Sequence, residues 1–182
     1  TEEKEEDKTR GDPHSLLCKA AANGDLAAIN ANYKAEGRSI VNDPETGPDI
    51  TQEELETNSK YKGLVMPGGD YPIHLAAQAG QVAAVKRLFD LEADLEKKTE
   101  RFQSTPLIRA VSANQLEVAE FLLSKGVEVG ATNKIGNTAL HCASHNGNVE
   151  MAKLLLDNGA SKLIPLKNLV LMSALDYARH LP

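Results

Sequence analysis

The chain has 182 residues, 41% of them apolar, which suffices for one sizeable folded domain or a short array of small units. Its 20 Lys and Arg against 26 Asp and Glu give a net charge of −6, and the basic residues do not cluster with aromatic ones. We therefore expect no nucleic-acid partner, because phosphate binding needs concentrated positive charge. No apolar run approaches the roughly 18 residues of a membrane span, so we also expect no membrane insertion.

The chain begins with a charged segment, residues 1–14, in which no apolar residue precedes Pro13. This composition predicts a solvated tail, with a short Glu-rich helix as the alternative. The sequence starts at Thr1 without an initiator methionine, so its first residues do not indicate the compartment. We expect a soluble protein and favour the cytoplasm, and a secreted or periplasmic location stays open in case a leader has been removed.

A unit of about 33 residues then recurs along the chain. The segments DYPIHLAAQAGQVAAVKRLF, STPLIRAVSANQLEVAEFLL and NTALHCASHNGNVEMAKLLL align, with Gly80, Asn114 and Gly147 in one column at steps of 34 and 33 residues. A weaker copy, HSLLCKAAANGDLAAINANY, precedes them with Gly24 in that column, and a half copy, MSALDYAR, closes the chain.

Each copy is predicted to form two helices joined by a tight turn. Its second half carries apolar residues at i, i+3, i+6 and i+7, which gives one buried stripe. In the last full copy this stripe consists of Val149, Ala152, Leu155 and Leu156. Pro72 and Pro106 suit the first turn of a helix, where a missing N–H is harmless. Gly126 and Gly159 stand just past the second helix, where a left-handed cap is needed.

The motifs TPLIRA and TALHCA match the T-P-L-H-x-A signature well, YPIHLA matches it moderately, and SLLCKA and SALDYA match it weakly. In these motifs and their period the chain resembles the ankyrin repeat family over residues 15–37 and about 64–182. The resemblance implies an all-α solenoid of four to five helix-turn-helix repeats with β-hairpin-like loops, which binds another protein. Three positions depart from the pattern: Asn114 replaces the turn glycine, and Ile108 and Asp176 replace the motif histidine.

The predicted organisation follows the repeats and one insertion. It comprises a tail (1–14), an N-terminal capping repeat (15–38), an acidic insert loop (39–63), three repeats (64–99, 100–132 and 133–167) and a partial or capping C-terminal repeat (168–182). Thr51 and Glu54 have capping-box spacing, which predicts a short helix from residue 52 to about 58. The insert is either a tolerated loop extension or part of the binding face.

His141, Cys142 and His145 raise an alternative, a metal-binding or catalytic site. Two histidines at i and i+4 share one helical face, as in zinc proteases, but no Glu lies between them and further ligands, such as Asp176 or His180, would have to converge. The resemblance implies instead that His141 hydrogen-bonds to neighbouring backbone and joins adjacent repeats. We expect no metal, no cofactor, no enzymatic activity, and no disulfide between Cys18 and Cys142.

The candidate binding residues lie on the loop tips and the first helices. Phe102, Ile135 and Val170 occupy equivalent tips, and stacked exposed apolar residues mark interaction sites. The candidate residues around these anchors are Gln78, Arg101, Ser104, Ser112, Lys134, Asn137, His145, Leu169 and Met172. Alternatively, the NLVLM segment covers the core of the terminal repeat. We expect a chain that is monomeric alone and binds a protein, which could be an enzyme that it inhibits or sequesters; a spacer without partners is the remaining alternative.

Overall fold

The computed structural model describes residues 13–36 and 70–179, and within these ranges every regular element is a helix. The helices pair as α1 (Pro13–Asn23) with α2 (Leu26–Glu36), α5 (Pro72–Gln78) with α6 (Val82–Asp90), α7 (Pro106–Ser112) with α8 (Leu116–Ser124), and α9 (Ala139–His145) with α10 (Val149–Asp157). A short 3-10 helix, η1 (Ala160–Leu163), and α11 (Ala174–Arg179) follow. The expectation of an all-α solenoid is confirmed.

Helix α1 begins at Pro13, two residues before the boundary predicted at residue 15. Residues 1–12 of the expected tail and the whole expected insert lie outside the described residues, and so does the helix predicted from residue 52 to about 58. No helix in the described ranges combines the length and the apolarity needed to cross a bilayer.

The helix ends follow from the residues that the repeat pattern singled out. Pro72 and Pro106 occupy the first turn of α5 and α7, as predicted. The Thr138 hydroxyl accepts a hydrogen bond from the backbone N–H of His141 and caps α9, which satisfies one of the donors that a helix start leaves unpaired. The turn between the two helices passes through a residue in the left-handed region, and Asn114 adopts it with φ 58° where Gly80 has φ 73°. Asparagine tolerates this conformation better than other residues with side chains.

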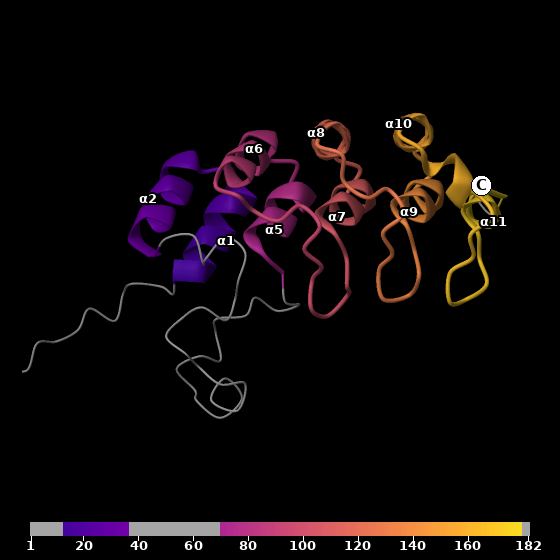
Figure 1. Ribbon diagram of the computed structural model, residues 1–182, viewed down its shortest axis with the longest axis horizontal. Helices are drawn as coiled ribbons and strands as arrows, with labels where there is room; N and C mark the ends of the chain where they lie inside the picture. Colours follow the sequence, from indigo (N-terminus) through magenta and orange to yellow (C-terminus); the bar gives the residue numbers. More distant parts are fainter. Residues whose placement is uncertain (1–12, 37–69, 180–182) are drawn as a thin grey trace, which may run out of the picture.

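The helices form two parallel rows (Figure 1). The first helices α1, α5, α7, α9 and α11 contact one another in chain order, and the second helices α2, α6, α8 and α10 lie along one side of that row. One hydrophobic core runs through the whole stack. Since each repeat packs mainly on its neighbours, the fold is quasi-one-dimensional.

Adjacent repeats also touch at the turn column. A methyl group added at Gly24 would collide with the Gln81 side chain of the next repeat, and one at Gly80 would collide with Gln115. Where the turn residue is Asn114, the next repeat has the shorter Asn148, whose Nδ2 donates to Asn114 Oδ1 at 3.3 Å. The larger turn residue is therefore accommodated by a smaller neighbour.

Candidate functional site

Three loops project from the same side of the first helices and lie side by side (Figure 1). They span residues 91–105, 125–138 and 164–173, and each leads into the first helix of a repeat. Within the described residues these loops contain no strand, and one isolated bridge pairs Lys167 with Ser173.

A polar residue closes the base of each loop. The backbone N–H of Thr99, Asn133 and Asn168 donates to the carbonyl oxygen of Ser104, Asn137 and Met172, at 3.0, 2.9 and 2.9 Å respectively. The side-chain oxygen of each closing residue also accepts the N–H of the returning segment, as in Asn168 Oδ1 with the Met172 N–H at 3.0 Å. Because the backbone groups pair locally, each loop holds its shape without a sheet.

Main-chain hydrogen bonds join one tip to the next. The Lys134 N–H donates to the Phe102 carbonyl at 2.9 Å, and the Leu169 N–H donates to the Ile135 carbonyl at 3.0 Å. Gly136 has φ 80°, and a methyl group there would lie 3.2 Å from both Asn168 Cα and Leu169 N. The tips are therefore close enough that backbone packs on backbone, and they form one continuous ridge.

The ridge presents apolar side chains to solvent. Phe102 is 45% exposed, Ile135 50% and Val170 64%. We call six of the exposed residues of the three tips the tip row: Arg101, Phe102, Lys134, Ile135, Leu169 and Val170. Arg101, Phe102, Asn133, Lys134 and Ile135 line a shallow hollow between the first two tips.

The ridge is basic, although the chain as a whole is acidic. Residues 97–103, 133–137 and 167–172 contain five Lys or Arg and one acidic residue, Glu100. The guanidinium carbon atoms of Arg101 and Arg109 lie 5.1 and 5.6 Å from the centre of the Phe102 ring, which is cation–π distance. Arg109 is also ion-paired with Asp70, whereas Arg101 and Lys134 are exposed.

Three predicted site residues occupy the loop bases instead of the tips. Ser104 is buried, and Asn137 and Met172 are half-buried, because the backbone of each pairs across the loop as described above. Placing Ser104 on the exposed surface was wrong. The closing residues Thr99, Asn133 and Asn168 were missed; they recur at steps of 34 and 35 residues, and this recurrence of a polar side chain could have identified them.

Gln78, Ser112 and His145 form a separate exposed column. Each is the last residue of its helix, α5, α7 or α9, whereas the tips precede the starts of these helices. Seven residues at about 1.5 Å per residue place this column roughly 10 Å along the helices from the loops. The ring of His145 lies 5.4 Å from that of Tyr177 in α11, edge to face.

The structure provides no support for the metal or catalytic alternative. His141 is fully buried, its Nε2 donates to the Leu166 carbonyl at 3.0 Å, and its Nδ1 lies 2.8 Å from the Thr138 hydroxyl. Both ring nitrogens are thus engaged, and burial lowers the pKa of His141. Burial also raises the pKa of the Cys142 thiol, which opposes the reactive thiolate form.

Across the described ranges no group of three or more His, Cys, Asp or Glu is arranged to hold a metal ion. Cys18 and Cys142 are both thiols rather than disulfide-bonded. His74 repeats the pattern of His141, since its Nε2 donates to the Lys97 carbonyl at 2.9 Å. These two motif histidines join the repeats of α5 and α9 to the loops that follow them, as the resemblance implied.

The family model described as ankyrin repeats, in three copies, matches residues 17–133, 73–165 and 126–180. The chain belongs to the ankyrin repeat family. Ankyrin repeats are protein–protein interaction modules, so this chain has the architecture of an interaction module.

Several ankyrin repeat proteins are similar in sequence to part of this chain. The chain is 38% identical to Inversin of Mus musculus over 113 residues, which cover 62% of this chain and 10% of Inversin. It is 34% identical over 100 residues to the B-cell lymphoma 3 protein homolog of Mus musculus, covering 55% of this chain and 21% of that protein. The chain therefore corresponds to a minor part of each of these relatives.

Proposed function

We propose that this ankyrin chain binds its protein partner through the tip row. The observation that carries the proposal is the ridge of three tips joined by main-chain hydrogen bonds, on which Phe102, Ile135 and Val170 are exposed in line. Exposed apolar residues in a contiguous row, surrounded by polar ones, are typical of protein-binding surfaces.

The ridge needs little reorganisation to bind. Its loop bases are closed by hydrogen bonds and its tips are fixed to one another, so little conformational entropy is lost on docking. A few apolar anchors can then suffice, with Phe102 and Ile135 on either side of the hollow between the first two tips. Arg101 and Lys134 at the same hollow favour a partner surface that carries acidic groups.

The chain acts by occupying its partner. It tethers the partner, sequesters it, or blocks an active site when the partner is an enzyme. Gln78, Ser112 and His145 form a secondary contact along the first helices when the partner is wide enough to span both columns.

The test compares capture of one partner by matched variants. The partner is first isolated with the wild-type chain and identified by mass spectrometry, and its dissociation constant is then measured for Phe102→Asp, Ile135→Asp and the control Val149→Asp. Val149 lies at the start of α10, away from the loops, and is 66% exposed, more than Phe102 or Ile135; its predicted place in the buried stripe was wrong. We expect at least a tenfold loss of affinity for the two tip variants and none for the control. Loss of a central apolar anchor costs more than about 1–2 kcal/mol of binding free energy.

Unchanged affinity in both tip variants would contradict the proposal and favour the spacer alternative or another surface. Since Phe102 and Ile135 are exposed, the variants should keep the wild-type melting temperature, which separates lost binding from lost folding. Raising the salt concentration should weaken the wild-type complex if the basic residues contribute.

A further inference from the structure

The anchor Phe102 has a half-buried cation beside it. The guanidinium carbon of Arg109, in α7, lies 5.6 Å from the centre of the Phe102 ring, and the Arg109 side chain is 19% exposed. Its Nη2 group donates a hydrogen bond to Oδ1 of Asp70, whose side chain is 11% exposed. Asp70 stands two residues before α5, so Arg109 connects the start of the preceding helical pair to the first tip.

Arg109 is held more firmly than the other cation at this ring. The guanidinium carbon of Arg101 lies 5.1 Å from the ring centre, but Arg101 is exposed and forms no ion pair with a described residue. A half-buried, charge-assisted hydrogen bond is stronger than a contact between exposed groups. Arg109 rather than Arg101 can therefore restrict the Phe102 ring.

The cation and the aromatic anchor occur in the same repeat. Of the three first helices that follow a described tip, α7 alone has a charged residue at this position, since Cys142 and Tyr177 occupy it in α9 and α11. The tips that precede these two helices carry the aliphatic anchors Ile135 and Val170. The arginine is thus found where the anchor has a ring with which a guanidinium group can interact.

The stability of the fold alone does not explain an arginine at this position. The Nε atom of Arg109 is buried and has no hydrogen-bond partner among the described residues. A buried donor without a partner is unfavourable for folding. In α5 the same position is occupied by Leu75, which buries no such donor. A role in binding accounts for the cation.

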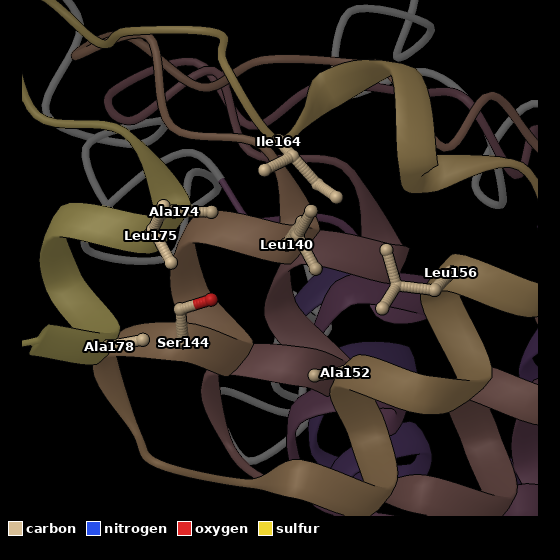
Figure 2. Close-up of a pocket in the computed structure, with 8 residues that line it drawn as sticks. All are labelled: Leu140, Ser144, Ala152, Leu156, Ile164, Ala174, Leu175 and Ala178. Carbon is tan, nitrogen blue, oxygen red and sulfur yellow. The ribbon is translucent and has the colours of Figure 1, made fainter.

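The apolar pocket between α9, α10 and α11 lacks a comparable arrangement (Figure 2). Its lining consists of aliphatic and alanine side chains and the Ser144 hydroxyl, with no aromatic ring and no charged group. A ring held by a cation therefore does not accompany every apolar surface of the described chain.

We propose that Arg109 is a positioning residue for binding: fixed by Asp70, it holds the Phe102 ring in the orientation in which the partner meets it. Ordering an exposed side chain on binding lowers affinity, and a ring that is already ordered avoids this loss. Arg109 acts through Phe102, so its effect on affinity disappears when the ring is removed. The inference rests on the proposed function, in which the partner docks on the tip row.

The first measurement needs no partner. It follows the three Phe rings of the chain by NMR after selective carbon-13 labelling, and Phe102→Leu assigns the Phe102 signals. We expect the order parameter of the Phe102 ring axis to fall in Arg109→Gln towards the flexible range, below about 0.6. Phe89 and Phe121, whose ring centres are 6.0 Å apart on α6 and α8, should keep their order parameters and so report an intact fold.

Two further variants separate positioning from a general loosening of the stack. Asp70→Asn removes the group that fixes Arg109, so it should lower the order of the Phe102 ring too, and it replaces Arg109→Gln if that variant fails to fold. Arg87→Gln is the matched control, because Arg87 of α6 is also half-buried and joins two repeats, with its Nε donating to Asn30 Oδ1 at 2.5 Å. It should leave the Phe102 ring unchanged.

The second measurement is a double-mutant cycle on affinity. The probe is the partner protein isolated with the wild-type chain, and its dissociation constant is measured for Arg109→Gln, Phe102→Ala and the double variant. We expect Arg109→Gln to weaken binding roughly three- to tenfold in the wild-type background and not at all in the Phe102→Ala background. Arg87→Gln should leave the affinity unchanged.

Equal order of the Phe102 ring in wild type, Arg109→Gln and Asp70→Asn would overturn the inference. An equal loss of affinity from Arg109→Gln in both backgrounds would also overturn it, because Arg109 would then act without the ring. Both outcomes leave the proposed function standing when Phe102→Ala weakens binding. Unchanged affinity in Phe102→Ala would instead contradict the proposed function, and the inference with it.

Discussion

Three second helices, α6, α8 and α10, are followed two residues later by a residue with left-handed backbone, and one of these residues is not glycine. Gly126 and Gly159 have φ 78° and 97°, as the C-cap prediction required, whereas Glu92 occupies the same column with φ 65°. For a residue with a Cβ atom this conformation costs about 1–2 kcal/mol, which glycine avoids at some cost in chain entropy. The first complete repeat therefore contains local strain that the next two lack.

Glu92→Gly should accordingly raise the free energy of unfolding by about 0.5–1 kcal/mol, and Gly126→Ala should lower it by about 1 kcal/mol or more. A methyl group at Gly126 would meet no atom within 4 Å, so the second change isolates the backbone effect. Both values come from urea unfolding at neutral pH. A less stable Glu92→Gly variant would show that contacts of the Glu92 side chain outweigh the relief of strain.

The conformation of a residue can be predicted from the sequence where that residue alone determines its backbone. Its exposure is predicted poorly where pairing with another segment decides whether it is buried. The left-handed backbone of Gly159 could be predicted from its position just after a helix alone. Ser104 looks like a tip residue because it is polar and follows Phe102, but its backbone pairs with Thr99 across the loop and buries it. Pairing of this kind is invisible in a hydropathy pattern.

Among the elements, the motif histidines His74 and His141 connect α5 and α9 to the loops that follow their repeats and respond to pH. Burial lowers the pKa of His74 from 6.5 to about 4, and it lowers that of His141 as well. Between these pH values the unfolded chain binds more protons than the folded one, so protonation favours unfolding. The stability that the buried neutral His74 contributes is fully present above pH 6.5 and is lost as the pH falls towards 4.

For His74 the loss amounts to about 3 kcal/mol over that range. His74→Gln should be less stable than wild type at pH 7 by about 1–3 kcal/mol, since it loses buried hydrogen bonds. Its stability should nevertheless fall less steeply between pH 6.5 and 4.5, as urea unfolding at several pH values would reveal. Parallel pH profiles for the two proteins would mean that His74 does not titrate in this range.

The repeat pattern predicted the helical pairs because each pair buries a periodic stripe of its own. The ridge of tips was predicted only in part. Exposed apolar residues at equivalent positions indicated Phe102, Ile135 and Val170, but the hydrogen bonds between tips join backbone groups, which every sequence has.

At the scale of the whole molecule, a stack whose described repeats contact mainly their neighbours has a gradient of local stability. Interior helices such as α7 pack on both neighbouring repeats, whereas α11 packs on α9 alone among the described first helices. A helix that packs on a single neighbouring repeat opens before one that packs on both sides.

Native-state hydrogen exchange should therefore give α11 an opening free energy at least about 2 kcal/mol below that of α7. Its slowest amides should exchange at the rate of fraying, while those of α7 report global unfolding. Equal protection in both helices would indicate that the stack unfolds as a single cooperative unit, including its last helix.

The main-chain bonds between neighbouring tips have a consequence for how the family can diversify. Only peptide groups form the link from Lys134 to Phe102 and the link from Leu169 to Ile135. The outward side chains of these residues therefore take no part in the hydrogen bonds that join the tips. Selection can exchange these side chains one at a time while the underlying frame stays in place. Substitutions of exposed tip side chains can therefore change the binding specificity while the main-chain hydrogen bonds between the tips are kept.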